Sequence, residues 1–173
     1  NGSGTVIERL VESGTCTYAT ASALGLLDAE LTVREAADRC TAAVFCLDLF
    51  EKQQQIDRKE PAANASGFLI SSDGVAVTNY HSLEDGVYAL ATFSTGESYP
   101  VESVLYYDTE IDIAVVRLAK TSITGKEVSA FSYLELAGTE DVRPGTKALC
   151  AAFGGKGGGP KDMTQGVLSS GTE

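Results

Sequence analysis

Basic residues, histidines, cysteines and long apolar runs are all scarce in this chain of 173 residues. Lys and Arg together number 13, against 24 Asp and Glu, so the formal net charge is −11. Because a nucleic acid partner requires clustered Lys and Arg to neutralise its phosphates, this acidity argues against nucleic acid binding. No segment approaches the roughly 18 uninterrupted apolar residues that a membrane-spanning helix needs, and we predict no membrane span.

The few cysteines and the single histidine restrict disulfides and metal sites. The cysteines are Cys16, Cys40, Cys46 and Cys150. Their density is far below that of a disulfide-stapled scaffold, and we predict buried free thiols. No two of them have the C-x2-C spacing of a zinc site, and His81 is the only histidine. A Cys/His cluster is therefore difficult to assemble, and we predict no structural metal.

Residues 1–42 carry the sequence pattern of helices. Apolar residues recur at i, i+3 and i+4 in the runs 6–11 and 33–40, which is typical of amphipathic helices. Thr32 followed by Glu35 fits a capping box, in which two side chains satisfy free amides at the helix start. We expect a helical N-terminal extension here.

From Ala43 the apolar period changes to two, which predicts β structure. The polar stretch 53–61 predicts a loop. Asp73-Gly74 tolerates positive φ and predicts a tight turn between two strands, and Thr95-Gly96 predicts a second turn. Six short strands at close spacing indicate a barrel or a sandwich; they are expected at 44–49, 67–71, 75–78, 87–93, 99–107 and 113–118.

The C-terminal part predicts only two further strands. Residues 120–145 are irregular and are expected to form a connector. Strand-like runs follow at 147–153 and 163–169, separated by the glycine-rich loop 154–160. Two strands cannot close a second barrel, so we expect these residues to be the first strands of a truncated one.

His81 is the first candidate for chemistry, since an imidazole titrates near neutrality and can act as a general base when a carboxylate holds its other nitrogen. A lone histidine is more often structural or merely exposed. Its partner could be Asp108, Glu110 or Asp112, and spacing alone does not choose among them. Asp112 could equally be an ordinary strand-edge or turn residue.

Two segments carry a family resemblance. Residues 66–81 read SGFLISSDGVAVTNYH, which resembles the S-G-F-I-I-S-x-D-G-x-I-L-T-N-x-H run of bacterial HtrA-type, trypsin-like serine proteases, a run that ends at their catalytic base. Residues 109–118 read TEIDIAVVRL and are similar to the family's T-D-L-A-V-L-K-I segment, which supplies the aspartate that orients the histidine. Three further stretches, at 95–101, 134–145 and 164–169, resemble the family in the same order.

The resemblance implies an all-β, chymotrypsin-like fold in which His81 and Asp112 are catalytic residues. The likeness covers residues 43 to about 170, and residues 1–31 match no part of the family. After the helical extension at 1–42, which apolar spacing predicts, we expect a complete first barrel at 43–119, a connector at 120–145 and the first strands of a second barrel at 146–173. The function implied is that of a serine endopeptidase acting on polypeptides from an extracytoplasmic location, secreted or in the cell envelope, with no cofactor.

The sequence also departs from the family. No G-N-S-G-G motif occurs before Glu173, so the nucleophilic serine is absent from this chain and we expect the chain alone to be inactive. Tyr80 stands where the family often carries a small or amide side chain. The alternative is a non-catalytic pseudo-protease or protein-binding module. An exposed apolar edge where a second barrel would pack predicts self-association.

Overall fold

The computed structural model describes residues 32–84, 86–138, 144, 147–153 and 160–167. Most of its regular secondary structure is β, as expected for the predicted all-β fold class. Helix α3 (Val33–Thr41) precedes the first strand, and two short helices, α4 (Gln53–Arg58) and α5 (Tyr80–Glu84), lie between strands. None of the helices in these ranges is long and apolar enough to cross a membrane.

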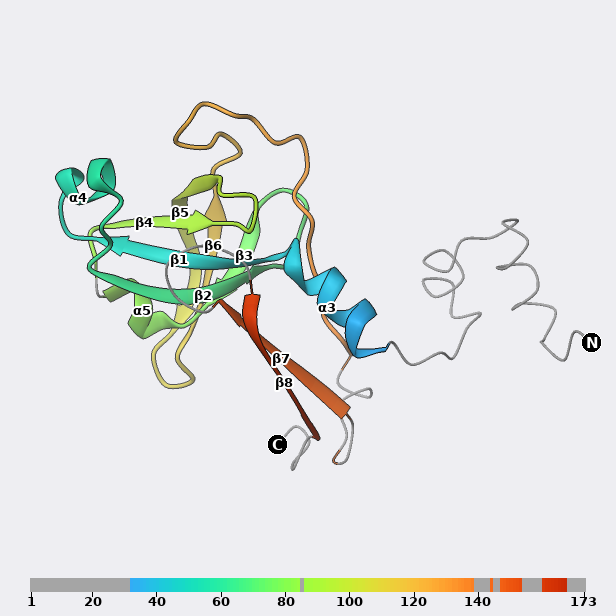
Figure 1. Cartoon of the computed structure of the whole chain (residues 1–173). Helices are drawn as coiled ribbons and strands as arrows, with labels where there is room; N and C mark the ends of the chain where they lie inside the picture. The colour runs from blue at the N-terminus through green and yellow to red at the C-terminus, as the bar shows by residue number, and fades with distance from the viewer. Residues whose placement is uncertain (1–31, 85, 139–143, 145–146, 154–159, 168–173) are drawn as a thin grey trace, which may run out of the picture. The chain divides into compact units, whose positions relative to one another are not determined.

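Six antiparallel strands close into a barrel (Figure 1), in the order β1-β2-β3-β6-β5-β4. Their bounds are β1 Val44–Phe50, β2 Ala63–Leu69, β3 Val75–Thr78, β4 Tyr88–Thr92, β5 Ser98–Asp108 and β6 Ile113–Leu118. The barrel closes because β1 pairs with β4 as well as with β2, which leaves no open edge on the first strand.

The interior of the barrel follows from the period-two pattern. Phe45, Leu47 and Leu49 alternate along β1, and all three side chains are almost completely buried. Each such burial contributes roughly 1.5–3 kcal/mol relative to an exposed side chain. Phe93 packs against Phe45 on one side and against Phe131 on another, with ring centroids 5.4 and 5.9 Å apart. These contacts tie the connector residue Phe131 to the barrel core.

The hairpin predicted around Asp73-Gly74 is confirmed. β2 pairs with β3 in the register Gly67 to Thr78, and Gly74 adopts a φ of 99°. Gly96, in the second predicted turn, has a φ of 85°. Glycine has no Cβ to oppose these values, so both turns form where the sequence indicated.

One predicted loop is wrong. Residues 53–58 form helix α4, although they show no apolar period. The Gln55 side-chain oxygen accepts hydrogen bonds from the backbone N–H groups of Glu51 and Lys52, at 2.8 and 3.1 Å. Lys59 ends the helix in the left-handed conformation, with a φ of 55°. Local capping, rather than burial of an apolar face, therefore accounts for this helix.

The C-terminal strands are β7 (Lys147–Phe153) and β8 (Pro160–Val167), which form a two-stranded antiparallel sheet. β7 has the predicted bounds, whereas β8 begins three residues earlier than expected, at a proline that can occupy the first position of a strand. Residues 120–138, within the described part of the connector, form no helix or strand; an isolated β-bridge pairs Thr121 with Glu127.

The side chains of two of the four cysteines are described, and both are free thiols. Cys46 is buried, and Cys40 is partly buried and packs against the same small apolar cluster. Burial, reinforced by the nearby Asp48 carboxylate, raises the pKa of Cys46 to about 12. The helix predicted at 6–11 and the side chains of Cys16 and Cys150 lie outside the described residues.

Candidate active site

The paired strands β3 and β6 bring His81 and Asp112 together. His81 lies on α5, which starts two residues after β3 ends, and Asp112 is the last turn residue before β6. Because Thr78 of β3 pairs with Ala114 of β6, the residues just outside this pair lie side by side. The distance between His81 Nδ1 and Asp112 Oδ2 is 2.6 Å.

This contact determines which nitrogen of the His81 ring carries a proton in the neutral form. An ionised carboxylate can only accept hydrogen bonds, so Nδ1 must be the donor to Asp112. The lone pair then resides on Nε2, the nitrogen that a general base uses. The His81 side chain is 66% exposed and the Asp112 side chain 38% exposed, so solvent and an external reactant can reach the pair.

Asp112 is held by more than the histidine ring. Its Oδ1 accepts a hydrogen bond of 2.8 Å from the His81 backbone N–H. Its backbone carbonyl accepts from the Tyr80 N–H at 3.3 Å and from Asn79 Nδ2 at 3.2 Å. Asn79 Nδ2 also lies 3.3 Å from Asp112 Oδ2. Three consecutive residues therefore donate to one aspartate.

These donors stabilise the ionised form of Asp112. The His81 backbone N–H is the largest influence, followed by the His81 ring, with the Asn79 amide contributing less, and together they lower the pKa of Asp112 below its ordinary value of 3.8. The carboxylate is thus charged near neutral pH, as a group that orients an imidazole and stabilises an imidazolium must be.

The other two carboxylates considered from the sequence have different positions. Asp108 Oδ1 accepts backbone N–H groups of Glu110 and Ile111, at 2.8 and 3.2 Å, and so closes the turn between β5 and β6. Glu110 is an exposed residue of that turn. In the described part of the chain, Asp112 alone of the three hydrogen-bonds to His81.

Sequence reasoning missed the roles of Asn79 and Tyr80. Asn79 contacts Asp112 across 33 residues of sequence, and the only available signal was its place in the T-N-x-H run. The Tyr80 ring stacks on Tyr107 of β5, with centroids 5.2 Å apart and an interplanar angle of 25°. No periodicity reports either contact, since both depend on the pairing of β3, β6 and β5.

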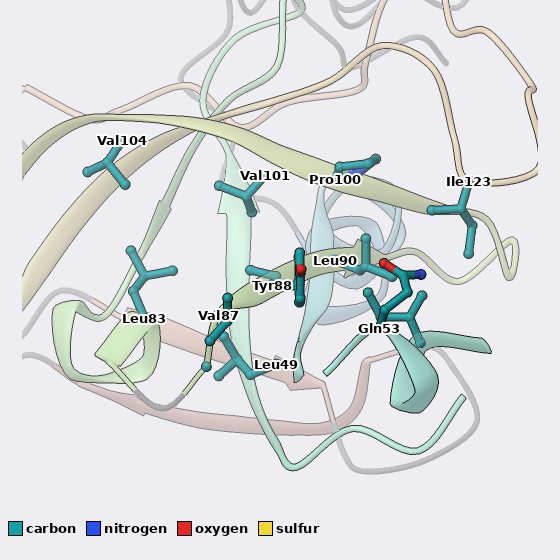
Figure 2. Close-up of a pocket in the computed structure, with 13 residues that line it drawn as sticks. Leu49, Gln53, Leu83, Val87, Tyr88, Leu90, Pro100, Val101, Val104 and Ile123 are labelled. Carbon is teal, nitrogen blue, oxygen red and sulfur yellow. The ribbon is translucent and has the colours of Figure 1, made fainter. Parts of the chain in front are cut away.

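A separate apolar groove of about 450 Å³ lies where β4 and β5 diverge beyond their last paired residues, Leu90 and Pro100. Figure 2 shows Val101 and Val104 of β5, together with Val87 and Leu83, among the side chains that line it. Among the described residues that line this groove there is no carboxylate, imidazole or thiol. The groove therefore contains neither of the group types that meet at His81 and Asp112.

Comparison with known proteins agrees with this geometry. The family model of the trypsin-like peptidase domain matches residues 65–173, which include both His81 and Asp112. The chain belongs to the trypsin-like peptidase family. The six-stranded antiparallel barrel agrees with the all-β, chymotrypsin-like fold expected for that family.

Within the trypsin-like peptidases, the similar proteins are serine proteases of the HtrA and DegP type. The chain is 27% identical to serine protease HTRA1 of Xenopus tropicalis over 138 residues, which are 80% of this chain and 28% of the relative. It is 29% identical to a probable periplasmic serine endoprotease DegP-like of Chlamydia pneumoniae over 118 residues, or 68% of this chain and 22% of the relative. Serine protease HTRA2, mitochondrial, of Bos taurus is 28% identical over 80% of this chain.

These relatives qualify two expectations, namely a bacterial source and an extracytoplasmic location. They come from vertebrates as well as bacteria, and two of the names place their proteins in the periplasm and in the mitochondrion. The family resemblance is therefore confirmed at the level of HtrA-type, trypsin-like peptidases, whereas a bacterial source is not implied. The chain spans about a quarter of the length of the curated relatives that it matches.

Proposed function

We propose that this chain provides the histidine and aspartate of a serine endopeptidase of the HtrA type, with His81 as general base and Asp112 as the group that orients it. The observation that carries the proposal is the 2.6 Å contact between His81 Nδ1 and Asp112 Oδ2, with the ring exposed to solvent. The serine nucleophile would come from sequence that is not among these 173 residues, since none of their serines lies in a G-N-S-G-G motif.

In the proposed reaction His81 Nε2 removes the proton of the serine hydroxyl as the oxygen attacks a peptide carbonyl. The protonated ring then donates that proton to the leaving amine, and an acyl-enzyme remains, which water hydrolyses with His81 again as base. Asp112 keeps the proton of the neutral ring on Nδ1 and stabilises the imidazolium by its charge. Such positioned acid–base catalysis contributes roughly 10²–10⁴-fold in rate.

The proposal includes an organisation and a location. Residues 43–119 are the first barrel, 120–145 the connector and 146–173 the start of a second barrel, with residues 1–42 as an extension. Polypeptides are the proposed substrates. An extracytoplasmic location is supported by relatives named as periplasmic, and fractionation of cells that express the natural protein tests it.

The deciding experiment measures hydrolysis of unfolded casein by a longer form of the protein that includes a Gly-x-Ser-Gly-Gly segment, beside its His81→Ala and Asp112→Ala versions. We expect His81→Ala to abolish measurable cleavage and Asp112→Ala to lower kcat by several orders of magnitude. The 173-residue chain alone should not cleave casein. Undiminished cleavage by His81→Ala would refute the assignment of the base, and an inactive longer form would favour the pseudo-protease.

A further inference from the structure

Asp112 occupies a backbone conformation that needs support. Its φ is 57°, in the left-handed region that non-glycine residues rarely adopt. Its side chain is 38% exposed, and that of His81 is 66% exposed. A carboxylate and an imidazole so open to water gain little from mutual attraction alone, because solvent screens them. The Tyr80 N–H holds the Asp112 carbonyl and the His81 N–H holds Oδ1, but neither of these two groups contacts both the backbone and the carboxylate of Asp112.

Asn79 is placed to do this at two atoms at once. Its Nδ2 group donates to the Asp112 backbone carbonyl at 3.2 Å and to Asp112 Oδ2 at 3.3 Å. The first contact fixes the peptide that follows the left-handed residue. The second contact reaches the same carboxylate oxygen that binds His81 Nδ1 at 2.6 Å. The amide of Asn79 thereby couples the backbone of the turn to the rotamer that faces the imidazole.

Asn79 is itself held in place by its neighbours in the chain. It directly follows Thr78, whose buried hydroxyl donates to the Ser66 carbonyl at 2.9 Å. It directly precedes Tyr80, whose N–H donates to the Asp112 carbonyl and whose ring stacks on Tyr107. The Asn79 backbone is thus anchored on both sides, so its amide approaches Asp112 from a rigid strand end.

We propose that Asn79 is a positioning residue, which holds the Asp112 carboxylate in the orientation that keeps the proton of neutral His81 on Nδ1. Its contacts are with Asp112, so it would act through that residue. The inference deepens the proposed function and rests on it for its catalytic meaning, but its structural content can be tested on this chain without any proteolysis.

The single histidine makes the test simple, since the chain gives one set of imidazole signals. ¹⁵N NMR shifts of the His81 ring, recorded above its titration, report which nitrogen carries the proton. We expect the unmodified chain to show a protonated Nδ1 and an unprotonated Nε2. Asp112→Asn defines the limit in which the carboxylate is lost, and Asn79→Ala should move the shifts measurably toward that limit without reaching it, because the His81 and Tyr80 N–H groups still hold Asp112. Asn64→Ala, which removes an exposed asparagine amide on β2, away from Asp112, is the control and should leave the His81 shifts unchanged.

Asn79→Ala shifts identical to those of the unmodified chain, beside displaced shifts in Asp112→Asn, would overturn the role of Asn79 while leaving the His81–Asp112 pair intact. Unchanged shifts in Asp112→Asn as well would overturn the pair and with it both proposals. Circular dichroism shows whether each variant retains the barrel.

A second measurement needs no variant. In the unmodified chain, the Asn79 side-chain amide signals should titrate together with the assigned ¹³C carboxyl signal of Asp112, rather than with those of Glu84, Asp108 or Glu110, the other carboxylates on α5 and on the β5–β6 turn. An Asn79 amide that does not respond when Asp112 titrates would contradict the proposal even if Asn79→Ala fails to fold.

Discussion

At the scale of single residues, the low pKa of Asp112 depends mainly on a backbone group. The His81 N–H is a larger influence than the His81 ring, and His81→Ala removes only the ring. In that variant we therefore expect the pKa of Asp112 to rise above its value in the unmodified chain but to stay below 3.8, the ordinary value. A ¹³C NMR titration of the Asp112 carboxyl measures it, and a pKa of 3.8 or above would show that the ring dominates.

The same pKa has a consequence for stability. A carboxyl group whose pKa is lower in the folded chain than in the unfolded chain stabilises the fold above the unfolded pKa, and this contribution is lost as pH falls through the folded pKa. The difference in free energy of unfolding between the unmodified chain and Asp112→Asn should therefore shrink below about pH 4. Urea unfolding of the unmodified chain and of Asp112→Asn, at pH 3 and at pH 6, measures this difference.

Gly67 is the second residue with a sharp prediction, because the Phe45 ring fills the space where a side chain would begin. A Cβ at position 67 would lie 2.5 Å from Phe45 Cζ and 2.6 Å from Cε2. Phe45 is fully buried and cannot move aside freely. We expect Gly67→Ala to lower the free energy of unfolding by about 1–3 kcal/mol in urea denaturation.

The matched double variant tests the cause. Phe45→Leu destabilises the core by itself but removes the ring atoms that a methyl group at position 67 would meet. The two changes together should therefore cost less than the sum of their separate costs. Strict additivity would mean that Gly67 is needed for a reason other than its closeness to Phe45.

At the scale of elements, the strands could be predicted and α4 could not. Alternation over 113–118 matches the burial of one face of β6. The run 44–49 forms β1 as predicted, although β1 is buried on both faces. Helix α4 has no buried residue, so no apolar period could mark it. Its stability comes from one side chain, Gln55, and from the left-handed Lys59, neither of which a hydrophobic pattern contains.

Gln55→Ala tests this origin of α4. The substitution leaves the backbone N–H groups of Glu51 and Lys52 without their side-chain acceptor, a loss that costs about 1 kcal/mol at a helix start. We expect hydrogen exchange of the α4 amides to accelerate by about fivefold, with little change in the unfolding temperature of the barrel. Gln54→Ala, on the exposed side of the same helix, is the control. Equal effects of the two variants would contradict the capping role.

At the scale of the whole molecule, neither the closure of the barrel nor the pairing of His81 with Asp112 could be predicted from local sequence patterns. Six strands of period two fit a barrel or a sandwich equally well, and only the pairing of β1 with β4 decides, as in Leu47 opposite Ala91. Likewise, the choice of Asp112 over Asp108 and Glu110 depends on β3 pairing with β6 on its second edge, rather than with β4, the strand that follows it in the sequence. Such long-range pairings are invisible to local patterns, and the family resemblance supplied them instead.

The apolar surface of β5 leads to a prediction for the assembled state. Beyond Pro100, β5 pairs only with β6, so within the described residues its other edge has no strand partner. Four large side chains on this stretch are about half exposed, namely Val104, Leu105, Tyr106 and Tyr107. An exposed apolar strand edge favours pairing with a second copy. We therefore expect the 173-residue chain to self-associate.

Charge determines how that association responds to salt. The net charge of −11 makes two copies repel each other, and 0.1 M salt reduces the screening length to about 10 Å. The average mass from light scattering should thus rise with protein concentration and rise further with added NaCl. Leu105→Lys places a charge on the apolar edge and should return the mass to that of a monomer, whereas Ser94→Lys, an equal charge change in the β4–β5 turn, should not. A monomer at high concentration and high salt would contradict the prediction, because it would show that the exposed edge of β5 does not pair with a second copy.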